Sequence, residues 1–315
     1  MAKKDIALKT WLKNKERFAD FFNGVVFNGK QTIKPRELEE AYGESDIIAT
    51  DKKGTERAFN RYRDVVMRWR GGVNLAILAI ENQTRIDYTM PVRSMLYDAM
   101  SYDEQLRVVH TQKGAKGNYL KSFGKNDSIY PVITVIFYYG DRPWKDNKEL
   151  HNMFKNIDKE LYENFLKEYV PNYKLNILDA NNVVEVDKFQ TDLQIVLGMI
   201  KYKKDNEGLE RYVHKHKKYF KNVEKDSIDV ITAIMEMEQL KEYIPNVEEG
   251  ERVDMCKALQ DMCKKNRDAG IETGRKEGIR SIVVNMIRKG LSTEDICDLA
   301  QCETEYVEEL RETLV

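Results

Sequence analysis

The chain has 315 residues, 33% of them charged, and acidic and basic side chains nearly cancel to a formal net charge of -1. This balance excludes a strong overall field that would hold the protein on a polyanion, so any contact with nucleic acid must come from local patches. The sequence has no apolar signal region at its start and no apolar run near the roughly 20 residues of a membrane span, so we expect a soluble, cytoplasmic protein without a membrane partner.

Helix and strand signals alternate over the first part of the chain. Apolar residues at helical spacing over residues 5–27 predict one or two opening helices. The segment 62–69, rich in Val, Met and aromatic residues, and the almost wholly apolar segment 73–80 predict two strands, the second covered on both faces. Pro91 begins a run of helically spaced apolar residues that reaches Leu106. A buried strand among helices is typical of an α/β protein.

The signals that follow complete a first domain, which we place at residues 1–205. Residues 111–127 combine glycines and lysines without periodicity and predict an exposed loop. The apolar segment 131–139 predicts a second buried strand, and weaker strand and helix signals lie at 175–178 and 191–202.

From residue 206 to residue 315 the pattern is helical throughout, which predicts a second, all-α region. Within it, Gly270, Gly274 and Gly278 recur every four residues, which would allow close approach of another helix or, equally, mark a flexible connector. Ser292, with an acid three positions later, predicts the N-cap of a helix that opens a C-terminal helical pair. That pair lacks a basic recognition helix, so we favour protein association for it over DNA binding.

A candidate site for chemistry follows the strand 73–80. Glu81 stands where a carboxylate is costly unless it has a partner or a metal ion. Residues two apart on a strand share a face, so Glu81 and Gln83 would point the same way, and the main-chain carbonyl of Asn82 could add a third oxygen. Hard divalent cations prefer oxygen ligands, and they polarise phosphates and lower the pKa of an attacking water. The segment therefore predicts a metal site for phosphodiester hydrolysis.

Asp64 lies on the strand before the glycine turn, and the length of that turn decides which residue faces it. A four-residue loop would pair Arg70 with Leu75 and set Asp64 opposite Glu81, close enough to share one ion. A two-residue turn would set Asp64 opposite Ala79 instead, with Glu81 as a diagonal neighbour. The sequence leaves both registers open.

Four stretches in chain order carry a resemblance to a known family. They are Arg63-Asp64-Val65-Val66, then Ile80-Glu81-Asn82-Gln83-Thr84 with Met90-Pro91-Val92-Arg93, and the strand segment from Pro131 to Trp144. Together they resemble the Rpn family of recombination-promoting nucleases, which are also described as transposases, over roughly residues 5 to 205.

This resemblance implies a restriction-endonuclease-like α/β fold of the PD-(D/E)XK superfamily, with a mixed sheet flanked by helices, and metal-dependent cleavage of DNA. Carried over, Asp64 and Glu81 become ligands of Mg²⁺, Mn²⁺ or Ca²⁺ together with Asn82. Gln83 takes the place of the superfamily's lysine and would orient the water. Asp5 matches an N-terminal acid of the family more loosely, and an ordinary helix-capping acid explains it better.

Glutamine cannot supply the positive charge of that lysine, so we expect slower chemistry that depends more on the metal. Arg85 and Arg93 could recover part of the charge if they face the site. Arg61 and Arg63 belong to a basic patch beside the site, so these four arginines are candidate DNA contacts.

We therefore expect a metal-dependent DNA endonuclease that acts in recombination, on mobile elements or in defence. Its candidate partners are DNA and a second copy of the chain bound through the C-terminal helices. The rival interpretation keeps the fold and makes the protein a weakly catalytic or inactive DNA-binding or assembly protein, in which Gln83 accompanies lost activity. A second basic segment, 201–221 with interleaved tyrosines, is favoured as a solvated helix face.

Overall fold

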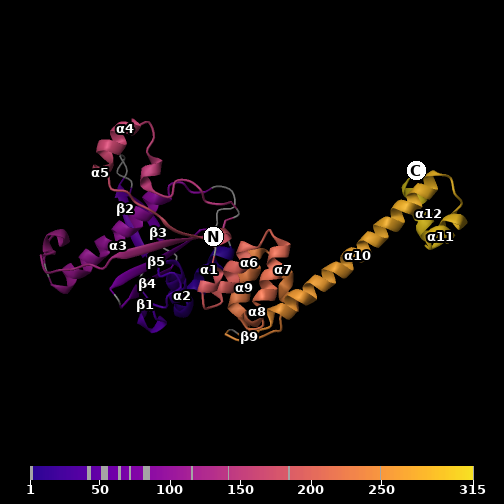
Figure 1. Cartoon of the computed structure of the whole chain (residues 1–315), viewed down its shortest axis with the longest axis horizontal. Helices are drawn as coiled ribbons and strands as arrows, with labels where there is room; N and C mark the ends of the chain where they lie inside the picture. The colour runs from indigo at the N-terminus through magenta and orange to yellow at the C-terminus, as the bar shows by residue number, and fades with distance from the viewer. Residues whose placement is uncertain are drawn as a thin grey trace. The chain divides into compact units, whose positions relative to one another are not determined.

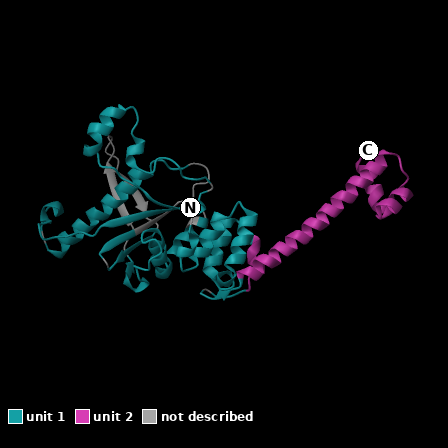
Figure 2. Ribbon diagram, in the orientation of Figure 1, with its two compact units in different colours: residues 1–238, 246–254 teal, residues 239–245, 255–315 magenta. Residues whose placement is uncertain are grey.

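The computed structural model describes residues 3–40, 44–50, 56–62, 65–70, 72–80, 86–114, 116–140, 142–183, 185–248 and 250–314, with the backbone alone described for residues 3, 5, 44–50, 56–62 and 76–80. The chain divides into two compact units, one of residues 1–238 with 246–254 and one of residues 239–245 with 255–315 (Figure 2).

A five-stranded mixed sheet forms the centre of the first unit (Figure 1). In spatial order its strands are β1 (Leu38–Glu40), β4 (Val65–Trp69), β5 (Val73–Ile80), β6 (Val132–Tyr138) and β7 (Asn176–Asp179). β4 is antiparallel to both of its neighbours, whereas β5, β6 and β7 run parallel. The two most apolar segments of the sequence are thus β5 and β6, side by side, and the expected α/β core with a mixed sheet is confirmed.

Helices cover both faces of this sheet. They are α1 (Lys3–Leu12) and α2 (Lys15–Val25), which confirm the predicted opening helices, and α3 (Met90–Gln112), which confirms the helix predicted after Pro91. The ring of Phe21 in α2 packs edge-on against Phe137 in β6, with centroids 5.6 Å apart, while Tyr97 of α3 packs in a cluster with Ile136. Neighbouring strand residues point to opposite faces, so α2 and α3 cover opposite faces of β6.

Local capping signals explain where several helices begin. The side chain of Asn14 accepts hydrogen bonds from the backbone amides of Glu16 and Arg17 and caps α2. Pro91 occupies the first turn of α3, where its missing N–H costs nothing. In the second unit, Ser292 accepts from the backbone amide of Asp295 at 3.1 Å, which confirms it as the predicted N-cap.

The register between β4 and β5 differs from both registers that the sequence left open. Met67 pairs with Leu75 and Trp69 with Val73, so three residues, 70–72, connect the paired positions. The predicted pairing of Arg70 with Leu75 is therefore wrong. The placement of Asp64 opposite Glu81 was derived from that pairing and no longer follows from it. A backbone φ of 82° at Gly72 and a hydrogen bond of 2.9 Å from its amide to the Trp69 carbonyl close the shorter loop.

The remaining elements of the first unit include two strands that the sequence did not predict. β2 (Glu44–Thr50) and β3 (Glu56–Tyr62) form a separate antiparallel pair. The others are α4 (Lys159–Leu161), α5 (Lys167–Tyr169), α6 (Leu193–Lys201), α7 (Asn206–Lys215), α8 (Lys217–Phe220) and α9 (Lys225–Met235), with the short pair β8 (Val223–Glu224) and β9 (Arg252–Val253). α6 contacts α2, α7 and α9, and α9 contacts α1, so the compact unit extends past the domain boundary expected at residue 205.

The second unit consists mainly of α10 (Met255–Arg288), α11 (Thr293–Ala300) and α12 (Thr304–Thr313). The end of α10 packs with α11 and α12 around a small apolar core of Val283, Ile296, Val307 and Leu310. The three repeated glycines lie inside α10, within the stretch 263–278 where every residue is exposed. A Cβ added at any of them would meet no atom within 4 Å beyond the local helix backbone, so no other described helix approaches there. Among the described residues, no helix has the length and apolar character of a membrane span.

Candidate functional site

Most of the predicted site falls outside the part of the chain that the structure describes. This holds for Asp64, Glu81, Asn82 and Gln83, and for the candidate DNA contacts Arg63 and Arg85. The backbone of Asp5 lies in α1 and that of Arg61 in β3, but their side chains are not described. Arg93, in the first turns of α3, is the one predicted contact whose side chain is described. The metal site and the water-orienting role therefore stay predictions.

The strands that border residues 64 and 81 in the sequence meet at one end of the sheet. β4 begins at Val65, which pairs with Ile77, and β5 runs on to Ile80, which pairs with Tyr138 at the end of β6. Tyr138 in turn pairs with Asp179, the last residue of β7. We call this end of the sheet the carboxyl end, because the three parallel strands finish there. Parallel strands commonly present their sites at that end.

Two further observations concern the carboxyl end. In the sequence, Asp64 directly precedes the first residue of β4, and Glu81 directly follows the last residue of β5. α1, which contains Asp5, contacts β5. The predicted acids thus flank, along the chain, elements that the structure brings together.

Arg93 is engaged in a hydrogen-bonded cluster at the start of α3. Its guanidinium forms an ion pair with Asp87 and donates a hydrogen bond to the Tyr97 hydroxyl at 3.1 Å. Asp87 also accepts from the backbone amide of Thr89 at 2.9 Å and from the Thr89 hydroxyl at 2.5 Å. Burial raises the pKa of Asp87, but the hydrogen bonds from Thr89 and Arg93 outweigh it and hold the pKa below its ordinary value. Asp87 therefore offsets much of the charge that Arg93 was expected to bring to a phosphate.

Two described acids near the carboxyl end were not singled out from the sequence. Asp87 carries a recognisable signal, because an Asp two residues before Thr89 and four before Pro91 suits a turn that leads into a helix. Asp179 accepts hydrogen bonds from the Asn181 backbone amide at 3.1 Å and from the Asn182 side chain at 2.6 Å, so it caps the turn after β7. Its signal is its place at the end of a predicted strand.

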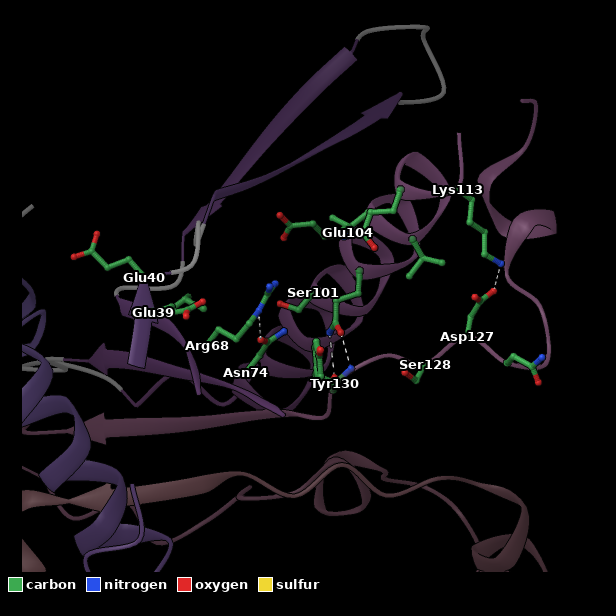
Figure 3. Close-up of a pocket in the computed structure, with 16 residues that line it drawn as sticks. Glu39, Glu40, Arg68, Asn74, Ser101, Glu104, Lys113, Asp127, Ser128 and Tyr130 are labelled. Atoms are coloured by element: carbon green, nitrogen blue, oxygen red, sulfur yellow. Dashed lines mark hydrogen bonds and ion pairs between the residues drawn. The ribbon is translucent and has the colours of Figure 1, made fainter. Parts of the chain in front are cut away.

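A groove lies at the opposite end of β4 and β5, between the sheet and the second half of α3 (Figure 3). Its volume is about 710 Å³, and β1, β4, β5, α3 and the segment 126–130 supply its walls. Arg68 contributes its guanidinium, with Nε 3.4 Å from the Asn74 side-chain oxygen and the charged carbon 5.8 Å from the centre of the Tyr130 ring.

The charges of this groove do not suit a nucleic-acid backbone. Four carboxylates line it, against two cations, and they are Glu39, Glu40, Glu104 and Asp127. One of the two cations, Lys113, forms an ion pair with Asp127 across the wall (Figure 3). An excess of negative charge repels phosphates, so we place no DNA contact in this groove. Within the described residues, no group of three or more His, Cys, Asp or Glu side chains is arranged to hold a metal ion.

The parallel strands of the first unit finish together, and the candidate acids lie next to strand ends along the chain. Many α/β proteins bind their ligands at this carboxyl end of a sheet. A family model described as "Putative transposase, YhgA-like" matches residues 71–230, just over half of the chain. The chain therefore belongs to this transposase family, which is the Rpn family that the sequence resembles. No curated protein and no solved structure matches the chain.

Proposed function

We propose that the protein is a metal-dependent DNA endonuclease with a restriction-endonuclease-like core, which hydrolyses phosphodiester bonds at the carboxyl end of the sheet. Asp64 and Glu81 are the proposed metal ligands, the Asn82 carbonyl is the third oxygen, and Gln83 orients the attacking water. DNA is then the principal partner. Membership of a transposase family supports a role in recombination or on mobile DNA, and the cytoplasm is the compartment in which we place that role.

One observation carries the proposal. β4 starts and β5 ends at the same end of the sheet, and the chain places an acid directly before the one strand and directly after the other. Two carboxylates and a main-chain carbonyl form an all-oxygen donor set, which fits a hard cation such as Mg²⁺ better than a soft one. This fit supports Mg²⁺, with Mn²⁺ as a substitute.

Each proposed site residue has its own role in this reaction. The carboxylates of Asp64 and Glu81 bind the ion, which when bound polarises the phosphate and lowers the pKa of a water. The Gln83 amide accepts a hydrogen bond from that water and fixes its direction of attack. Arg93 lies in α3. Its ion pair with Asp87 neutralises part of its charge, so it would attract a phosphate only weakly.

The test is nicking of supercoiled plasmid by the purified chain with Mg²⁺, with Mn²⁺ and with a chelator, beside the double variant Asp64→Ala, Glu81→Ala. We expect metal-dependent nicking by the native chain and at least about a hundredfold loss in the double variant, because metal polarisation contributes several kcal/mol. The double variant Glu160→Ala, Glu168→Ala, at two exposed carboxylates outside the proposed sites, is the matched control and should cut normally.

The rival account predicts a different pattern. A non-catalytic DNA-binding or assembly protein would bind plasmid without cutting it, and the double variant would bind as well as the native chain. Equal metal-dependent nicking by the native chain and a folded double variant would contradict the proposed site and point to a contaminating nuclease.

A further inference from the structure

A second hollow of the first unit lies far along the chain from the proposed nuclease residues. It has a volume of about 230 Å³ and lies between the end of α6, α7 and the turn 186–188. The surrounding segment 201–221 contains eight Lys or Arg residues and three Asp or Glu residues. The sequence alone favoured a solvated helix face for this segment, but a solvated face does not require a cavity lined by aromatic side chains.

Three cationic side chains line this hollow, namely Lys201, Arg211 and Lys215. Lys215 pairs with Asp187, the acid in the lining, at 3.0 Å. Arg211 contacts Glu207 at 3.4 Å, but both side chains are highly exposed, so this ion pair contributes little and is easily exchanged for another anion.

The side chain of His216 adds no charge to this balance at neutral pH. It is 8% exposed, with Nε2 3.3 Å from the Asp187 carboxylate. Burial lowers the pKa of His216 below its ordinary value, so the imidazole is neutral at pH 7. Lys215 thus offsets Asp187, and Lys201 and Arg211 give the hollow a net positive charge.

Aromatic rings packed against one another at a tilt form much of the remaining lining. The centroids of Tyr202 and Tyr212 lie 5.4 Å apart, and those of Tyr212 and His216 lie 4.5 Å apart. Tyr212 is buried, whereas Tyr202 is partly exposed at the rim, where the Lys201 ammonium lies 5.3 Å from the ring centre. A partly exposed ring beside cations is the arrangement with which proteins hold an unstacked base and its phosphate.

We propose that this hollow binds one nucleotide of a single DNA strand, with the base against Tyr202 and the phosphate on Lys201 and Arg211. The exposed lysines at 218 and 221 continue the positive charge along α8, so the neighbouring backbone follows this face. A hollow of this size admits an unpaired nucleotide and not a duplex. The choice of DNA rests on the proposed nuclease function; the choice of a single strand rests on the aromatic lining.

The test measures binding of a fluorescently labelled oligothymidylate strand by anisotropy, in a chelator so that cleavage cannot interfere. Tyr202→Ala should weaken binding at least about fivefold, and Tyr202→Phe should keep native affinity, since stacking needs the ring and not the hydroxyl. Lys201→Ala with Arg211→Ala should weaken binding and lower the dependence of log affinity on log salt by about one unit, as expected for lost phosphate contacts. Lys264→Ala with Arg267→Ala removes the same charge from exposed positions of α10 and should leave binding unchanged.

Thermal unfolding of each variant separates a binding effect from a folding defect. If Tyr202→Ala does not fold, the Lys201, Arg211 pair still tests the phosphate contact. Native affinity in the folded variants would overturn the proposal, and so would equal or tighter binding of a blunt duplex with the same sensitivity to these variants. Plasmid nicking by the same variants distinguishes the two proposals. If the chain binds the strand but does not cut plasmid, only the proposed nuclease function fails.

Discussion

The ring of Tyr212 in α7 lies against Gly198 in α6 so closely that a Cβ at position 198 would lie 2.1 Å from two ring carbons. The Tyr212 hydroxyl donates a hydrogen bond to the Gln194 carbonyl at 2.7 Å, one turn earlier in α6, and this bond fixes the ring over the glycine. The close approach of α6 and α7 therefore depends on glycine, and it places Tyr212 where it lines the basic hollow.

Gly198→Ala should destabilise the first unit. The added methyl group has no space beside a buried, hydrogen-bonded ring, so we expect the free energy of unfolding to fall by about 1–3 kcal/mol, even though alanine favours a helix. The three tryptophans, Trp11, Trp69 and Trp144, all lie in this unit, so urea unfolding followed by their fluorescence reports on it. An unchanged midpoint would contradict the close contact between α6 and α7.

The elements that the sequence predicted correctly are those with strong local signals. The segments that became β5 and β6 are continuous apolar runs, and such runs need no knowledge of their neighbours to be recognised as buried strands. The N-cap of α11 at Ser292 is likewise encoded within four residues.

The elements that the sequence missed depend on contacts far along the chain. β1 contains two glutamates in its three residues, and it forms because Glu39 and Glu40 pair with Arg68 and Met67 of β4. The register of β4 against β5 depends on the positive φ of Gly72, which the sequence permits but does not impose. The sequence predicts a DNA contact for Arg93 because its partner, Asp87, lies in a turn that periodicity does not reveal.

The ion pair between Asp87 and Arg93 should make stability depend on pH in a defined direction. The pKa of Asp87 in the folded chain is held below the ordinary value of 3.8, so the ionised carboxylate stabilises the fold above that pH and loses its effect as the pH falls through the folded value. Since the two side chains are 30% and 45% exposed, we expect Asp87→Asn to lower stability by only about 0.5–1 kcal/mol at pH 7.

The measurement is the urea midpoint of native chain and variant at pH 7 and below pH 3.8. The difference between them should shrink progressively as the pH falls below 3.8, because the Asp87 carboxyl becomes protonated first in the unfolded chain and then, below its lowered pKa, in the folded chain as well. In an Arg93→Ala background the same Asp87→Asn change should cost less at pH 7. A difference that grows in acid would show that the sign of the pKa shift is reversed.

The exposed middle of α10 should open locally, because its glycines weaken a helix that has no described neighbour there. Replacing Gly270, Gly274 and Gly278 with alanine should add roughly 1 kcal/mol of helix stability per position. Tryptic cleavage at Lys276 or Arg275 should then slow by about tenfold or more, if cleavage requires local opening. Cleavage at an unaltered rate would mean either that α10 is already firmly helical or that a partner covers the glycines, and size-exclusion chromatography of the two forms separates these cases.

Replacement of Gln83 by lysine tests the chemistry of the proposed nuclease site most directly. A glutamine can orient the attacking water but offers only a neutral hydrogen bond to the negative charge that builds on the phosphate, whereas a lysine adds a full positive charge. If the catalytic site is as proposed, Gln83→Lys should raise the metal-dependent nicking rate by about tenfold or more, and Gln83→Leu should lower it, because one well-placed donor is worth about 10²–10³ in rate. The rates are compared at saturating Mg²⁺ so that altered metal affinity does not obscure the chemical step. Equal nicking by all three forms would remove Gln83 from the catalytic site, while nicking by the lysine variant alone would favour the rival view that glutamine at this position marks a chain that binds DNA without cutting it.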